Sequence, residues 1–252
     1  MRLIRDSGIL MLRSLRESMR QPAIEIGNLF IPLFFFAVTV GAISSISEQA
    51  FGVSNFTGFQ LPVAMLQAIA GSAVAGAGIV NDIQKGYFDK LALTPTPRPA
   101  LVLGRMLADA VRAVVLVGVI IAVGILTGAG MESGPLGTLL LLVIAAAFSL
   151  SYTGFAVSLA LKTGSNQAVQ LSFLLFFPLL FLAPAFAPKE VFSGWLEFLA
   201  TINPVTYILE GSRSLVLDGW EPGRLLKAFA AIAGIAAVTI SMTVWAYRTR
   251  KV

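Results

Sequence analysis

Six long apolar stretches limit what this chain can fold into. They lie at about residues 27–46, 61–80, 107–128, 136–161, 167–187 and 225–247. A helix needs roughly 20 mostly apolar residues to cross the hydrocarbon core of a bilayer, and each stretch meets that length. Only 12% of the residues are charged, whereas soluble domains carry about 25%. We therefore predict an all-α integral membrane protein in which residues 1–252 form one transmembrane domain of six helices.

Basic residues predict the orientation of these helices. Thirteen of the 18 Lys and Arg residues lie in segments that an even number of helices places on one side, namely the N-terminal arm and residues 81–105, 162–166 and 248–252. The loops expected on the other side, 47–60 and 129–135, contain none. Because basic loops stay cytoplasmic, both termini and the 81–105 loop are predicted to be inside and residues 188–224 outside. The net charge of +5 thus reflects topology, and no nucleic-acid partner is expected.

Residues 3–20 have an amphipathic pattern. Charged residues from Arg5 to Arg20 share one helical face, and apolar residues such as Met11 and Leu15 share the other. We predict a helix in the membrane interface that ends before Pro22. It serves either as a topogenic anchor or as a lever that a cytoplasmic partner pushes, and the pattern favours neither role.

The 81–105 loop, NDIQKGYFDKLALTPTPRPALVLGR, is charged, aromatic and rich in proline. Asn81 or Asp82 can cap a short helix that continues through Leu91. The following prolines, from Pro95 to Pro99, lack N–H groups and predict an extended elbow. A stiff exposed element joined to two spans suits the docking of a partner. A solvated loop held by its prolines is the alternative.

Residues 188–224 are too short and too polar for two spans. They carry aromatic residues, among them Trp195 and Tyr207, that favour the headgroup level of a bilayer. We predict two short re-entrant helices in the outer leaflet, separated at Asn203 and Pro204. An aromatic belt without a further role is the alternative.

The sequence lacks several residue types and motifs that catalysis, metal binding or nucleotide binding would need. The chain has no Cys and no His, which removes thiol nucleophiles, most zinc sites and His-based acid–base catalysis, so no metal site is expected. It also lacks the G-x-x-x-x-G-K-[ST] motif that cradles nucleotide phosphates. The charges near the start of the third stretch, Asp109 and Arg112 with Arg105, are predicted to pair with one another, and a proton or substrate role is the alternative. Glu25 and Glu48 lie at the two ends of the first stretch. They are also predicted to have a structural role, and a proton or substrate role is the alternative.

Two signatures resemble type-2 ABC exporter permeases, in the branch typified by daunorubicin-resistance permeases. The first is an acidic-x-x-basic-Gly-x-x-acidic-x-Leu pattern followed by Thr-Pro, a basic residue and Leu-x-Gly; its matches are Asp82, Lys85, Gly86, Asp89, Leu91, Thr94, Pro95, Arg98, Leu101 or Leu103, and Gly104. The second is Asn-Pro-x-x-Tyr followed by Arg and Gly, matched by Asn203, Pro204, Tyr207, Arg213 and Gly219.

The resemblance implies a membrane subunit of the bacterial cytoplasmic membrane that is not itself an enzyme. Two separate nucleotide-binding subunits would bind ATP and Mg, and a second permease copy, identical or paralogous, would complete the pore. The residues implied to couple to the ATPase are Asp82, Lys85, Gly86, Tyr87, Asp89, Leu91, Pro95 and Arg98. The external gate would comprise Asn203, Pro204, Tyr207 and Arg213.

The resemblance also places the second and fifth stretches of two copies across a transport path. Pro178 and Pro184 are expected to kink the fifth stretch, which is either a structural feature or a flexible wall of that path. The path residues would be Phe173, Phe176, Phe177 and Phe181, with Gly71 and Gly76 allowing close packing.

The cargo implied is an amphipathic drug, antibiotic or lipid-like compound moved outward. Export of lipid-linked polysaccharide is an alternative within the family. An ion-coupled secondary transporter is a further alternative, although five of the six stretches lack central charges. An intramembrane enzyme is disfavoured by the missing His, Cys and paired deep carboxylates.

Overall fold

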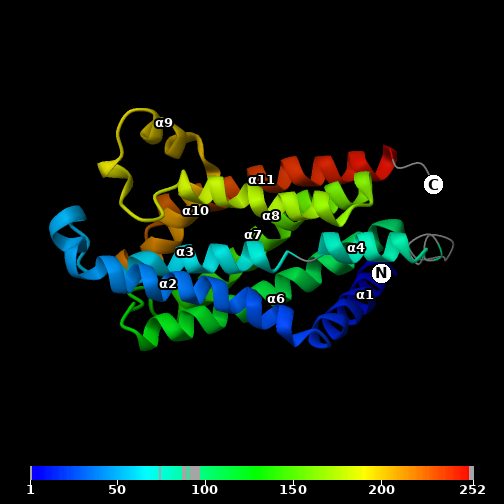
Figure 1. Ribbon diagram of the computed structural model, residues 1–252, viewed down its shortest axis with the longest axis horizontal. Helices are drawn as coiled ribbons and strands as arrows, with labels where there is room; N and C mark the ends of the chain where they lie inside the picture. The colour runs from blue at the N-terminus through cyan, green and yellow to red at the C-terminus, as the bar shows by residue number, and fades with distance from the viewer. Residues whose placement is uncertain (1, 74, 87–89, 91–96, 250–252) are drawn as a thin grey trace.

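The computed structural model describes residues 2–73, 75–86, 90 and 97–249, and this part of the chain is helical without a strand. The long helices run roughly side by side (Figure 1) and are α2 (Pro22–Phe51), α6 (Arg98–Leu126), α7 (Gly134–Thr163) and α11 (Pro222–Thr249). The shorter elements are α1 (Arg2–Met19), α3 (Phe56–Gly71), α4 (Ala75–Gln84), α8 (Asn166–Phe181), η1 (Lys189–Val191), α9 (Trp195–Ile202), α10 (Pro204–Arg213) and the π-helix η2 (Ser214–Asp218).

The molecule has two distinct ends. One end, here called the basic end, carries the start of α1, the end of α4, the start of α6 and the end of α11 (Figure 1). The opposite end, here called the re-entrant end, carries α9, α10 and the α2–α3 connection (Figure 1). The predicted orientation places the basic end in the cytoplasm.

Five of the six predicted stretches lie in segments long and apolar enough to cross a membrane, within the described residues. The fifth stretch differs, because its helix α8 has only 16 residues and ends at Phe181 rather than at residue 187. Pro184 explains the early end, since it lacks an N–H and disfavours helical geometry at the residue before it. Pro178, by contrast, is accommodated inside α8.

The second stretch is interrupted. Helix α3 ends at Gly71 and α4 begins at Ala75, whereas the sequence predicted a continuous span over 61–80. The first N–H groups of α4 therefore lack partners within their own helix and need an acceptor from elsewhere.

The 81–105 segment is less of a loop than predicted. Asn81 and Asp82 lie inside α4 and do not cap a new helix, because α4 continues to Gln84. The other side is also helical: α6 begins at Arg98 with a proline in its first turn, where a missing N–H has no cost. Pro22 likewise begins α2 instead of merely stopping α1. Residues 87–89 and 91–96 lie outside the described part of the chain.

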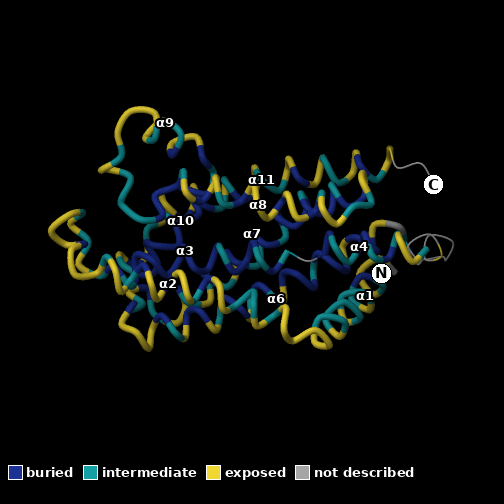
Figure 2. Tube along the Cα trace, in the orientation of Figure 1, coloured by how far each residue is buried: buried dark blue, intermediate teal, exposed yellow. Residues whose placement is uncertain are grey.

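Helix α7 forms the centre of the bundle and contacts α4, α6, α8 and α11. Its buried aromatics Phe148 and Tyr152 pack on Phe176 of α8, with ring centroids 5.5–6.4 Å apart. Thr239 of α11 donates a hydrogen bond to the carbonyl of Ser151 at 2.7 Å. In Figure 2, buried residues (dark blue) are concentrated in the middle of the molecule, and exposed residues (yellow) are concentrated on its outer helices.

The absence of Cys allows a clean test of orientation. We expect a membrane-impermeant maleimide added to intact cells to label Glu190→Cys, at the re-entrant end, and not Lys85→Cys, at the basic end. Both positions are exposed, so accessibility within the fold does not bias the comparison. Labelling of Lys85→Cys from outside would contradict the predicted orientation.

Candidate functional site

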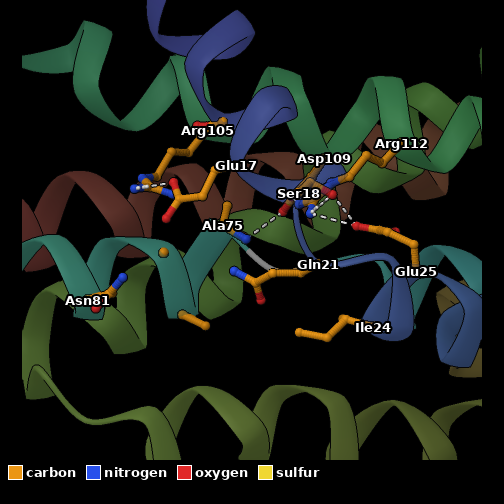
Figure 3. Close-up of a pocket in the computed structure, with 13 residues that line it drawn as sticks. Glu17, Ser18, Gln21, Ile24, Glu25, Ala75, Asn81, Arg105, Asp109 and Arg112 are labelled. Carbon is orange, nitrogen blue, oxygen red and sulfur yellow. Dashed lines mark hydrogen bonds and ion pairs between the residues drawn. The ribbon is translucent and has the colours of Figure 1, made fainter.

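Charged side chains from four helices meet at the basic end. Helices α1, α2, α4 and α6 contribute four acidic and three basic residues, here called the charged cluster: Arg13, Glu17, Glu25, Asp82, Arg105, Asp109 and Arg112. Figure 3 shows five of them around a cavity between the α1–α2 junction and α4. The cluster is the one place where the described helices gather so many charges, and it adjoins the α4–α6 connection.

Asp82 is the centre of the first half of the cluster. Arg105 donates to its Oδ2 from Nε at 3.1 Å and also from Nη2, and both side chains are 9% exposed. Arg13 of α1 donates to the other oxygen at 3.2 Å, and Glu17 lies 3.6 Å from Arg105. Gly78 makes room for this arrangement, because a Cβ there would lie 2.0 Å from the guanidinium of Arg105. The ion pairs therefore bind α4 to both α6 and α1.

Asp109 is the centre of the second half. It is fully buried, and its Oδ2 accepts a hydrogen bond from the N–H of Ala75 at 2.8 Å. It thereby caps α4 at the interruption of the second span, where both the unpaired N–H groups and the helix dipole favour a negative charge. Arg112 donates to the other oxygen of Asp109 and lies 3.4 Å from Glu25 of α2.

The pairing predicted from sequence is thus correct for Asp109 with Arg112 and wrong for Arg105. Arg105 contacts Asp82 and Glu17 instead of Asp109. The reason is that α4 passes beside the first turns of α6 and places Asp82 within reach of Arg105, whose Nε and Nη2 both donate to the same carboxylate oxygen.

The cavity beside the cluster holds about 220 Å³. Ser14, Ser18 and Gln21 add polar groups to its wall, and Ile24 adds an apolar one (Figure 3). No group of His, Cys, Asp or Glu in the described residues is arranged to hold a metal ion. The site offers ion pairing and hydrogen bonding, and the Ser18 hydroxyl in its wall donates a hydrogen bond to Glu25.

The residues predicted to couple to an ATPase have different positions. Asp82 is buried in the cluster, Lys85 is exposed, and Gly86 has a positive φ of 65° with open space around it. Arg98 is the first residue of α6. The remaining four lie outside the described residues: Tyr87, Asp89, Leu91 and Pro95.

The residues predicted to line a transport path are only partly exposed. Phe173 and Phe181 are 38% and 53% exposed, while Phe176 is buried at 1% among the aromatics of α7. Phe177 packs edge-to-face on Phe173, with centroids 5.1 Å apart.

The two glycines of the predicted path also differ. A Cβ on Gly76 would lie 2.9 Å from the carbonyl oxygen of Ala156 in α7, so this glycine permits close helix packing inside the chain. A Cβ on Gly71 would meet only ordinary contacts with Asn28 and Phe173.

The residues predicted for the external gate form one folded unit. Asn203 caps α10 by accepting from the N–H of Val205 at 3.0 Å, and it donates to the carbonyl of Leu179 near the end of α8. Pro204 occupies the first turn of α10, as expected for a residue without an N–H. The predicted break between two short helices is therefore confirmed.

Two further residues fasten this unit. Tyr207 donates to the carbonyl of Thr201 in α9 at 2.6 Å. Arg213 is buried, donates to the carbonyl of Phe59 at 2.9 Å and lies over that ring at 3.5 Å from its centroid. Arg213 thus ties α10 to α3.

Sequence reasoning missed Arg13 and Glu17 as members of the site. Both belong to the polar face of the N-terminal amphipathic helix, which was expected to face water. The available signal was their spacing of four residues, which places a cation and an anion on one helical face beside the charged start of α6.

Apolar helices of spanning length with a charged cluster at one end of the bundle are typical of an integral membrane protein. The chain belongs to the ABC-2 type transporter family, whose model matches residues 6–217. A daunorubicin resistance ABC transporter permease protein from Streptomyces coeruleorubidus is 27% identical over 223 residues, which cover 86% of this chain and 76% of that protein.

Two further relatives agree. A probable doxorubicin resistance ABC transporter permease protein from Mycobacterium tuberculosis is 21% identical over 213 residues, covering 84% of this chain and 77% of that protein. A putative transport permease from Cyanophora paradoxa is 24% identical over 220 residues, covering 84% and 74%. The chain is therefore a permease subunit of an ABC transporter, a multi-pass protein of the cytoplasmic membrane whose family works with ATPase partners.

The capping of α4 by Asp109 predicts a large cost for its removal. Asp109→Ala leaves the N–H of Ala75 without an acceptor and removes one partner of Arg112, so we expect the free energy of unfolding to fall by about 3 kcal/mol. Asp109→Asn keeps an acceptor oxygen and should cost less. Unfolding of the detergent-solubilised chain by SDS titration measures both.

A matched control is Asp218→Ala, which removes an exposed carboxylate paired with Arg224. An exposed pair of this kind contributes about 0–1 kcal/mol. Equal losses for Asp109→Ala and Asp218→Ala would contradict the capping role.

Proposed function

We propose that this chain is the pore-forming permease of an ATP-driven exporter that moves an amphipathic drug, antibiotic or lipid-like compound outward across the cytoplasmic membrane. The observation that carries the proposal is the family match over residues 6–217, which includes both the charged cluster and the α4–α6 connection. Two relatives are named as permeases for daunorubicin and doxorubicin resistance, which supports an apolar polycyclic cargo.

ATP hydrolysis takes place on two separate nucleotide-binding subunits in this proposal. The sequence contains no G-x-x-x-x-G-K-[ST] motif, so a phosphate cradle of that type is supplied by a partner together with Mg. The permease then contributes no catalytic residue and responds to movements of the ATPase.

The α4–α6 connection is the proposed contact with the ATPase. Lys85 is exposed beyond the last residue of α4, in a position to meet a partner. Asp82, nearly one turn earlier, is held by Arg105 and Arg13, so a displacement of the connection is transferred to α6 and α1. This assigns Asp82 to the support of the connection and leaves Lys85, Gly86, Tyr87, Asp89, Leu91, Pro95 and Arg98 as proposed contact residues.

A second permease copy is proposed to complete the path. Exposed residues occur along both α2 and α8 (Figure 2), and they include the large apolar residues Phe30 at 63%, Phe34 at 52% and Leu174 at 62% exposure. Phe173, Phe177 and Phe181 belong to the same outer surface of α8, which supports their assignment to the path. The buried Phe176 supports α8 from behind.

Transport in inside-out membrane vesicles tests the proposed function. With its ATPase subunits present, the wild-type permease should accumulate daunorubicin when ATP is added, and ionophores that dissipate ion gradients should leave accumulation intact. The purified permease alone should release no phosphate from ATP. Accumulation driven by an ion gradient without ATP would contradict the proposal in favour of a secondary transporter.

The proposed contact at Lys85 gives a sharper prediction. Lys85→Glu reverses an exposed charge without altering a spanning helix, so the chain should insert normally. Because a charge pair at an interface can contribute 2–5 kcal/mol, we expect ATP-driven accumulation to fall at least about tenfold.

The matched control is Lys227→Glu, which makes the same change at an exposed position near the re-entrant end. It should transport like the wild type. If Lys85→Glu assembles and transports normally while Lys227→Glu fails, the coupling surface lies elsewhere.

A further inference from the structure

A second cavity, distinct from the charged cluster, opens between α1, α6, α7 and α11. It is a groove of about 690 Å³ with a predominantly apolar lining. Helix α11 lines it with one stripe that includes Ala236, Ile240, Thr243 and Tyr247, spaced as residues on one helical face are. Val102 and Met106 of α6 form part of the facing wall.

The length of the groove corresponds to one leaflet of a bilayer. Its lining on α11 extends from Ala236 to Arg248, which at about 1.5 Å per residue is roughly 18 Å. The hydrocarbon core of a bilayer is about 30 Å thick, so one leaflet contributes about 15 Å. The groove therefore fits an acyl chain that enters from the leaflet at the basic end.

Polar groups gather at one end of the groove. Arg248, in the last turn of α11, is exposed and has no ion-pair partner among the described residues. Leu3 and Ile4 of the first turn of α1 line the same end. The positive end of the α1 dipole and the unpaired N–H groups of a first helical turn therefore also lie there, and such groups favour phosphate.

Ser7 supplies an independent observation. Its residue is 4% exposed, it lines the groove, and its hydroxyl has no hydrogen-bond partner within the described chain. Buried hydroxyls are normally paired, so an unpaired one beside a cavity indicates a ligand that can pair with it. None of the described residues that line the groove is acidic.

We propose that the groove binds an anionic phospholipid of the cytoplasmic leaflet, with an acyl chain between α6 and α11 and its phosphate near Arg248, Ser7 and the start of α1. Arg248 at the rim and the lack of acidic residues in the described lining favour a headgroup with net negative charge. Basic pockets between membrane helices on the cytoplasmic side bind such headgroups. The bound lipid would join the interfacial helix α1 to the last span α11.

Photolabelling of the full-length chain tests this assignment. The chain is placed in phosphatidylcholine nanodiscs that contain a trace of phosphatidylglycerol with a diazirine on its acyl chain. After illumination, we expect labelled peptides from the groove walls, around Met106 and Ile240. Unlabelled phosphatidylglycerol should compete for the label, and additional phosphatidylcholine should not.

Variants separate binding from folding. Arg248→Glu should lower labelling of the groove at least about fivefold, since one basic residue at the membrane surface already contributes that much. Lys227→Glu, a charge reversal at an exposed position of α11 outside the groove and near the re-entrant end, should leave it unchanged. Ile240→Trp fills the groove and should remove the label while size-exclusion profile and helical content stay those of the wild type.

Three outcomes would overturn the proposal. Labels spread evenly over all outward-facing helices would indicate surrounding lipid only. Equal competition by phosphatidylcholine, or unchanged labelling of Arg248→Glu, would remove the charge selectivity.

Discussion

The ion pair between Asp82 and Arg105 is the contact on which the arrangement of the basic end depends. Taking two charges out of water is costly, and the cost is offset only when the geometry is good and the remaining hydrogen-bonding groups are satisfied. Both conditions hold here, because Arg105 donates twice to one oxygen of Asp82 and Arg13 donates to the other. Loss of either partner would leave a buried charge with one remaining ionic contact, Arg13 for Asp82 or Glu17 for Arg105, so the pair keeps α4 in a fixed relation to α6.

The interrupted second span depends on the same part of the molecule. A helix that restarts inside the membrane region exposes N–H groups that lipid cannot satisfy. Asp109 satisfies one of them, and Arg112 pairs with the charge of Asp109 while also lying 3.4 Å from Glu25. Two halves of one cluster thus hold the two ends of α4: Asp109 at its start and the Asp82 pair in its last turn. In the proposed function, this short held helix transmits the movement of the ATPase.

Short-range sequence patterns predicted those parts of the fold that depend on residues close together in the sequence. Hydrophobic length identified the spans, amphipathic spacing identified α1, and the Asn203–Pro204 pair marked the start of α10 through its capping chemistry. The interruption after Gly71 had no such signal, because the surrounding Gly and Ala residues include no proline and are compatible with a continuous helix. The carboxylate that caps α4 at this interruption comes from Asp109, more than 30 residues further along the chain.

The candidate site was predicted less well for the same reason. Asp82 was interpreted as an exposed contact residue, yet its partners come from 23 and 69 positions away in the sequence. Charge type and position are visible in a sequence, whereas the choice between a water-facing and a buried carboxylate depends on which helix packs beside it. The break at Asn203 and Pro204 carried a clearer local signal, whereas the burial of Arg213 depends on Phe59, 154 positions away in the sequence.

A double-mutant cycle tests most directly the claim that Asp82 and Arg105 bind α4 to α6. The full-length chain carrying Asp82→Asn, Arg105→Gln or both is unfolded by SDS titration, and the free energies of unfolding are compared. Residues in direct contact show non-additive effects, so the account predicts an interaction energy of at least about 1 kcal/mol. Losses that add to within about 0.5 kcal/mol would contradict it, because independent sites behave in that way.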